Sequence, residues 1–225
     1  MTERSEGSPL SREVMGHLRR VAGPVSLNDP RHGAVHGTSL EVIKYLLTTG
    51  RLPGIQVTDD PYIPGDISVF PTRQLDVSKI PDIASRSDVL ENTIAYARGI
   101  GRSHRFLTSL GLPLKHEDIR MARNFLTLPD EDEDGVLIPE KYFLQKGFSQ
   151  QQVDTAFREA DKTKACGFLL GISPAIQGAK ELDLVKGDPG EGDIAIRTFG
   201  KGLSFERISG FEPLGDAERK YVATF

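Results

Sequence analysis

Residues 31–40, RHGAVHGTSL, decide the fold because they carry a strand through a tight polar turn directly into a helix. Gly37 allows a close turn of the backbone, or a close approach by another molecule. Thr38 and Glu41 have the Ser/Thr-x-x-Glu spacing of a capping box, which predicts that Thr38 starts the helix. Apolar residues then recur at helical spacing as far as Gly50, a residue suited to the position just past a helix end.

His36 lies at the end of the predicted strand, beside backbone amides that the turn leaves exposed. Two interpretations follow from these residues alone. The histidine either forms part of a ligand-binding corner or is simply hydrogen bonded within a strand-to-helix turn.

The composition favours an ordinary globular domain. The chain has 225 residues, 38% of them hydrophobic, which is enough for one domain with a substantial core. A net charge of -4 argues against broad nucleic-acid binding by bulk charge. The single cysteine, Cys166, excludes an intramolecular disulfide and a cysteine-based zinc site. No apolar run reaches the length of a membrane span. We therefore expect a soluble cytoplasmic protein, with a secreted effector or toxin left open.

The order of predicted elements indicates an α+β fold rather than repeating βα units. Residues 1–10 are expected to be disordered and 11–225 to form one domain, with a mainly helical segment at about 87–162. The other predicted elements are a helix at 11–21, a strand at 66–73, a buried strand at 166–172, a strand at 193–199, a hairpin turn at 200–202 and its partner strand at 203–208.

Four features in one order resemble the ADP-ribosyltransferase superfamily. They are the strand ending in His36-Gly37-Thr38 before a helix and a glycine, a strand bounded by prolines, a helix carrying Ala95-Tyr96-Ala97, and a late strand that begins near an acidic residue. The similarity is closest to the branch of diphtheria-type toxins, poly(ADP-ribose) polymerases and RNA 2'-phosphotransferases. It covers about residues 31–214 and is most specific at His36-Gly37-Thr38.

The resemblance implies an NAD-binding domain with a split antiparallel sheet. His36 would contact the ribose on the adenosine or the nicotinamide side, and the backbone of Gly37 would hold the nicotinamide carboxamide, within the motif that Thr38 completes. Tyr96 would pack against nicotinamide, with Tyr62 as a second candidate. A flat ring bearing an amide needs an aromatic face together with backbone donors and acceptors, so these residue types suit the ligand.

The same resemblance implies a catalytic carboxylate at the start of the late strand. Cleavage of the nicotinamide–ribose bond passes through an oxocarbenium-like state, which a carboxylate bound to a ribose hydroxyl stabilises. Alignment of the strand places Asp193 there, where the family usually has glutamate, and Glu191 lies two residues earlier. An aspartate is one methylene shorter, so either residue is a candidate. The expected enzyme is a glycosyltransferase that uses NAD as a substrate and an unidentified protein or nucleic acid as the acceptor.

Three other functions remain open. An RNA 2'-phosphotransferase-like or otherwise nucleic-acid-directed enzyme would need convergent arginines, and Arg31, Arg73, Arg102 and Arg105 are available. A non-catalytic domain of the same fold would bind a nucleotide or ADP-ribose. A metal-dependent hydrolase would use His32 and His36, because residues four apart on a strand share a face.

Overall fold

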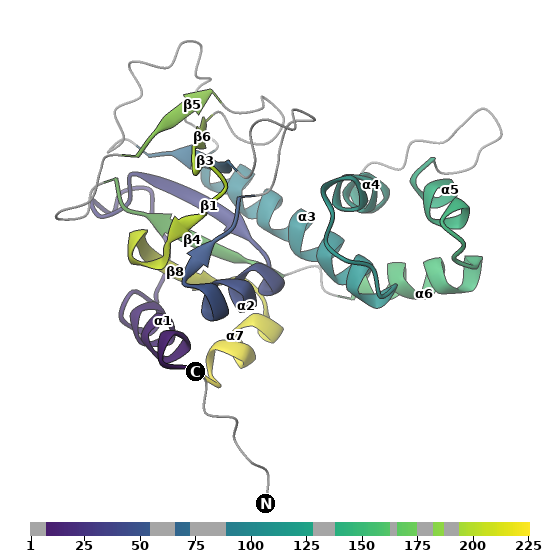
Figure 1. Ribbon diagram of the computed structural model, residues 1–225, viewed down its shortest axis with the longest axis horizontal. Helices are drawn as coiled ribbons and strands as arrows, with labels where there is room; N and C mark the ends of the chain where they lie inside the picture. The colour runs from purple at the N-terminus through teal and green to yellow at the C-terminus, as the bar shows by residue number, and fades with distance from the viewer. Residues whose placement is uncertain are drawn as a thin grey trace, which may run out of the picture.

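A computed structural model describes residues 8–54, 66–72, 89–127, 138–162, 166–174, 182–186 and 194–225. Within these ranges the chain has a mixed α+β fold, with a six-stranded antiparallel sheet and helices packed on both of its faces (Figure 1). This agrees with the predicted fold class at the level of α+β.

The strands of the main sheet lie in the order β5-β6-β3-β1-β4-β8. Their bounds are β1 Ala34–Thr38, β3 Ile67–Pro71, β4 Phe168–Ile172, β5 Leu184–Lys186, β6 Ile194–Ile196 and β8 Ile208–Pro213. A second, two-stranded sheet joins β2 (Arg51–Leu52) to β7 (Leu203–Ser204). The helices are α1 Pro9–Arg20, α2 Leu40–Thr49, α3 Val89–Ser109, α4 His116–Thr127, α5 Ile138–Gln145, α6 Gln150–Asp161, α7 Asp216–Val222 and a 3-10 turn at Phe205–Arg207.

Strand β1 pairs completely with one neighbour and only partly with the other. Its five residues pair with β4 from Ala34 to Thr38. The ladder with β3 has only two pairs, Ala34 with Pro71 and Val35 with Phe70. The sheet is therefore split after Val35, where β1 and β3 separate.

The alternation of side chains along β1 divides the core between the two faces of the sheet. Ala34 joins the apolar core of α1 and α2, whereas Val35 packs with Ala97 of α3. Strand β4 alternates in the same way, with Leu170 on the first face and Leu169 on the second. All five residues of β4 are buried, as the continuous apolar run at 166–172 predicts.

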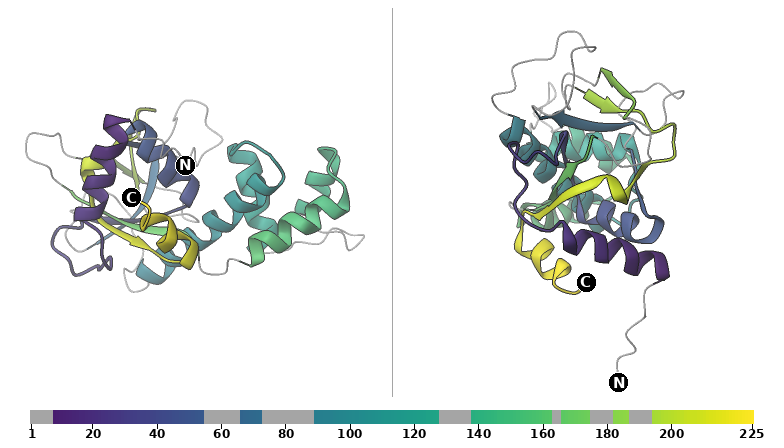
Figure 2. Two further views of the ribbon diagram at one scale, coloured as in Figure 1. Left: turned by 90° about the horizontal axis from the view of Figure 1, so that it is seen from below. Right: turned by 90° about the vertical axis from the view of Figure 1, so that its left-hand side faces the viewer.

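Helix α3 runs from beneath the sheet into a lateral arm formed with α4, α5 and α6 (Figures 1 and 2). The arm has its own apolar core, in which Phe106 of α3 contacts Phe143 of α5 edge-on, with ring centroids 4.9 Å apart. Helix α6 begins with the capping box of Ser149 and Gln152 that the sequence indicates. None of the helices in the described ranges is long and apolar enough to cross a membrane.

Helix α1 begins earlier than predicted. Ser8 caps it by accepting a hydrogen bond from the Ser11 N–H (3.1 Å), and Pro9 occupies the first helical turn. Proline is favoured there because its missing N–H would have no partner within the helix. The expected disorder of residues 1–10 is therefore wrong from residue 8 onward.

The predicted hairpin around residues 200–202 is also wrong. Strand β6 pairs with β3 and β5, and β7 pairs with β2. The turn itself is present, but the residues that follow Ser204 form the 3-10 turn and then β8 beside β4. The long-range partners of these short strands leave no local signal in the sequence.

Candidate functional site

His36 bridges the split between β1 and β3. The ladder between these strands stops at Val35, and the His36 imidazole spans the gap, with Nδ1 2.7 Å from the carbonyl oxygen of Ser68. Only 6% of the His36 surface remains exposed. The hydroxyl of Ser68 is buried at the same place and has no hydrogen-bond partner among the described residues.

The bond to Ser68 fixes the chemical state of His36. A carbonyl oxygen can only accept, so Nδ1 must carry the proton and donate it. Burial lowers the pKa of His36 to about 4, against the opposing effect of the bond to Ser68, which favours the charged form. The ring is therefore neutral at pH 7, and Nε2 is left as a hydrogen-bond acceptor.

Gly37 is the point where α3 lies closest to β1. A Cβ atom added to Gly37 would lie 2.7 Å from the Thr93 carbonyl oxygen and 2.8 Å from the Ala97 Cβ. Gly37 is therefore required for the packing of α3 on β1. The molecule that comes close to its backbone on this face is α3 itself, and not a ligand. On its other side Gly37 lies beyond the last β1–β3 pair, Val35 with Phe70.

The turn after β1 differs in detail from the prediction. Thr38 is the last residue of β1 and pairs with Phe168, so it does not cap α2. Ser39 is the cap, and its hydroxyl accepts from the Val42 N–H. The pairing of β1 with β4 is the cause, because it keeps the backbone of Thr38 extended. The helix therefore begins one residue later than predicted.

Ser39 also joins α2 to α3 through a buried histidine. Its Oγ lies 2.6 Å from Nδ1 of His104 on α3. Burial lowers the pKa of His104 to about 4, so this ring is neutral as well. Its Nε2 is buried and lacks a hydrogen-bond partner in the part of the chain that the structure describes.

Tyr96 lies on α3, close to the glycine contact but turned toward the arm. Its ring contacts Phe70 of β3 edge-on at 6.4 Å, and the guanidinium of Arg123 lies 5.2 Å from its centroid. Phe70 pairs with Val35 at the last rung before the split. Tyr96 is thus joined to the His36 region through Phe70, and its ring is mostly buried.

The two predicted carboxylates, Asp193 and Glu191, and the second aromatic candidate, Tyr62, lie outside the described residues. The structure does describe β6, the strand that follows these two carboxylates in the sequence. Strand β6 begins at Ile194, which pairs with Val69, the neighbour of Ser68 on β3.

His32 and His36 do not form a metal site in this fold. His32 precedes β1 and is not part of the strand, so the four-residue spacing does not place the two rings together. Its Nδ1 lies 2.9 Å from Ser209 Oγ, and the ring packs over Gly171 and Gly210 on the β4–β8 side. Within the described ranges no group of three or more potential metal ligands occurs.

The three arginines within the described ranges that could have bound a phosphate together lie at separate places. Arg31 is exposed and pairs with Asp29 (2.6 Å) before β1 begins. Arg102 binds Asp161 (3.1 Å) between α3 and α6. Arg105 lines a different pocket, described next, and Arg73 falls outside the described residues.

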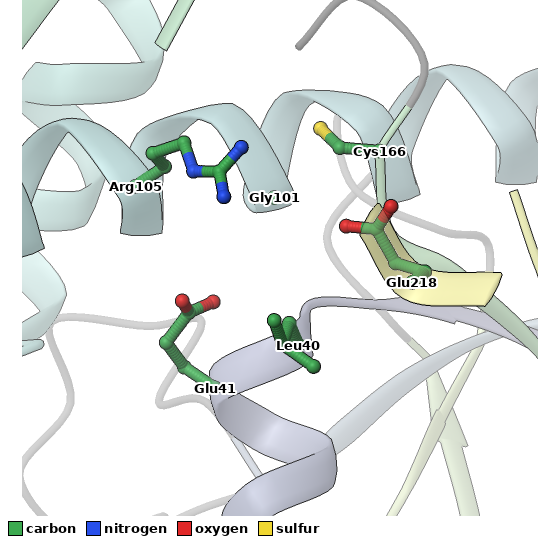
Figure 3. A pocket seen from close by; sticks show the side chains of 6 residues that line it. All are labelled: Leu40, Glu41, Gly101, Arg105, Cys166 and Glu218. Atoms are coloured by element: carbon green, nitrogen blue, oxygen red, sulfur yellow. The ribbon is translucent and has the colours of Figure 1, made fainter. Parts of the chain in front are cut away.

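A small open pocket lies where the start of α2 meets α3 and α7, and no motif in the sequence indicates it. Its lining residues are Leu40, Glu41, Gly101, Arg105, Cys166 and Glu218. Figure 3 shows the charged side chains of Glu41, Arg105 and Glu218 directed toward the same space. Glu218 is buried, and its Oε2 has no hydrogen-bond partner in the described part of the chain. None of the residues predicted to bind NAD that the structure describes, His36, Gly37, Thr38 and Tyr96, lines this pocket.

Comparison of the chain with models of known protein families, with characterised proteins and with solved structures gave no match.

Proposed function

We propose that the chain is an NAD-dependent ADP-ribosyltransferase. It would break the bond between nicotinamide and ribose and transfer the ADP-ribose to an acceptor. The observation that carries the proposal is the state of His36, a neutral histidine held by Ser68 at the split between β1 and β3.

The chemistry of His36 supports ribose binding. With Nδ1 committed to Ser68, Nε2 accepts a hydrogen bond from a ribose hydroxyl. A neutral ring makes this acceptor available across the physiological pH range. The backbone of Gly37 continues the same strand edge, where its amide and carbonyl suit the nicotinamide carboxamide.

The place of β6 supports a carboxylate opposite the histidine. Strand β6 starts directly after Asp193, and its first residue, Ile194, pairs with the β3 residue next to Ser68. A carboxylate bound to a ribose hydroxyl would stabilise the oxocarbenium-like state. Nicotinamide would leave with the electron pair of the C–N bond, and the acceptor's nucleophile would bond to the ribose carbon and release its proton to water.

The proposal is tested with the variant His36→Asn. The asparagine amide reproduces the donor at Nδ1, so the bond to Ser68 is retained, but nothing replaces the acceptor at Nε2. A hydroxyl left without its partner costs about 1–3 kcal/mol, so we expect NAD affinity to fall by about tenfold or more. NAD binding is measured by calorimetry and nicotinamide release by mass spectrometry.

His32→Asn is the matched control, because it keeps the Nδ1 contact with Ser209 at a buried histidine outside the proposed site. It should bind NAD as the wild type does. Among Asp193→Asn and Glu191→Gln, only one variant should lose turnover. A wild-type protein that neither binds NAD nor releases nicotinamide would refute the proposal. Binding without turnover would identify a non-catalytic nucleotide-binding domain.

A further inference from the structure

The turn after β6 contains a phenylalanine in an unfavourable backbone conformation. Phe199 and Gly200 have φ angles of 52° and 73°, and the Lys201 N–H donates to the Thr198 carbonyl oxygen at 3.0 Å. Two central residues with positive φ define a type I′ turn, which favours Asn, Asp or Gly at the first of these positions. Among the described residues Phe199 is the only one other than glycine with a positive φ.

Burial does not offset this strain, and the surrounding chain prevents its relief. The Phe199 side chain is 67% exposed. On one flank the Thr198 N–H binds the buried carboxylate of Asp66 (3.2 Å). On the other, Gly202 packs so closely on β2 that an added Cβ would lie 2.6 Å from the Leu52 carbonyl oxygen. A strained residue held in place with its ring in solvent indicates a functional contact.

Two cations lie next to Phe199 along the chain. The Arg197 guanidinium lies 5.8 Å from the Phe199 centroid, and Lys201, the last residue of the turn, is exposed. Neither cation forms an ion pair with a carboxylate of the described residues. A flat aromatic face beside unpaired cations is complementary to a nucleobase and its phosphates.

The turn lies at the same end of the sheet as the split. Strand β6 ends at Ile196, which pairs with Ile67 of β3. The next residue of β3 is Ser68, whose carbonyl holds His36. A molecule bound at Phe199 would therefore lie at the end of the sheet where β1 and β3 separate.

We propose that Arg197, Phe199 and Lys201 dock single-stranded nucleic acid, and that this strand is the acceptor. The acceptor role rests on the proposed transferase function. A nucleophilic oxygen or nitrogen of the strand would bond to the ribose carbon and lose its proton to water, while nicotinamide leaves with the electrons of the C–N bond.

The exposed ring favours a single strand over a small nucleotide as the ligand. Small nucleotides bind in concave pockets, whereas single strands stack their bases on exposed aromatic rings. The neighbours of Phe199 along the chain are Arg197, Thr198, Gly200 and Lys201, whose charges suit a polyanion better than the apolar centre of a protein-binding hot spot.

The test uses the full chain and fluorescently labelled single strands of DNA and RNA of about 12 nucleotides, a length within the usual range of such sites. Binding is followed by fluorescence anisotropy at low salt. Phe199→Asn should weaken binding about 5- to 100-fold through the loss of base stacking, with a Tm at or above that of the wild type because asparagine suits the turn. Tyr45→Ala, which removes another exposed aromatic ring, on α2, is the matched control and should bind as the wild type does.

The cations are tested through the salt dependence. Arg197→Gln and Lys201→Gln should each reduce the slope of log K against log salt concentration by about 0.7, the value for one phosphate contact on a single strand. Unchanged slopes in both variants would overturn the assignment of the phosphates to these side chains.

Three results would overturn the docking proposal. The first is equal binding of the oligonucleotides by the wild type and by Phe199→Asn, and the second is no binding by the wild type. The third is displacement of the oligonucleotide by NAD together with equal weakening of both ligands in Phe199→Asn, which would assign the ring to the adenine of NAD. NAD binding and nicotinamide release are measured separately, without oligonucleotide, and they test the transferase proposal. Oligonucleotide binding tests the docking site, so the failure of one proposal is distinguished from the failure of the other.

Discussion

At the scale of single residues, the two glycines Gly37 and Gly99 have opposite requirements. Gly37 leaves no room for a side chain, since its Cβ would meet backbone and side-chain atoms of α3 at 2.7–2.9 Å. Gly99 is in the middle of α3, and apart from its chain neighbours and the backbone of its own helix no atom of the described residues would come within 4 Å of its Cβ. The first glycine is required by packing, and the second only weakens its helix.

We therefore expect Gly37→Ala to destabilise the protein by about 1–3 kcal/mol, the usual cost of overpacking. The contacts are with helix backbone, which cannot move aside without shifting α3. Gly99→Ala should instead stabilise by up to about 1 kcal/mol, through helix propensity. Urea unfolding measures both, and equal effects of the two variants would contradict the close packing of α3 on β1.

The sequence was enough to find the motif His36-Gly37-Thr38. It was not enough to predict that the His36 ring is neutral and protonated at Nδ1. The strand end and the histidine follow from local pattern. The neutral ring depends on the carbonyl of Ser68, 32 positions away along the chain, and on burial by the whole core. The role of Gly37 likewise depends on Ala97 of a distant helix.

At the scale of elements, the start of α2 shows how a strand ladder overrides a local signal. Thr38 and Ser39 are adjacent hydroxyl residues, and the Thr38–Glu41 spacing favoured the first of them as the cap. Pairing of Thr38 with Phe168 leaves Ser39 as the cap, where it also meets His104. The buried strand at 166–172 was predicted because its signal, a continuous apolar run, is local.

Ser39→Ala should cost about 2 kcal/mol, because it removes the cap of α2 and leaves Nδ1 of His104 buried without its partner. Thr38→Val, which keeps the shape of a side chain in a strand, should change stability far less. Thermal or urea unfolding monitored by circular dichroism measures the difference. A larger loss in Thr38→Val than in Ser39→Ala would mean that Thr38 is the cap after all.

At the scale of the whole molecule, the sheet and the arm have separate apolar cores connected by α3. Helix α4 packs on α3 and α5, and α6 packs on α3 and α5. Such an arrangement allows the arm to open while the sheet stays folded, because regions with separate cores unfold with different free energies.

Phe143→Ala removes a fully buried ring from the core of the arm and should cost about 3–5 kcal/mol there. Hydrogen exchange should accelerate in α4, α5 and α6, while the amides of β1 and β4 keep their protection. Leu114→Ala, at an exposed position between α3 and α4, should have little effect. Uniform loss of protection across sheet and arm would show instead that the molecule unfolds as one unit.

Cys166 lies at the junction on which both regions depend. Its thiol is buried just before β4 and packs so closely on α3 that a Cβ at Gly101 would be 2.9 Å from the sulfur. Burial raises the pKa of the Cys166 thiol to about 11. The chain has no other cysteine, so alkylation by a thiol reagent reports on this one place. The rate of alkylation therefore measures how often α3 separates from the sheet. A ligand that holds α3 against the sheet would lower this rate.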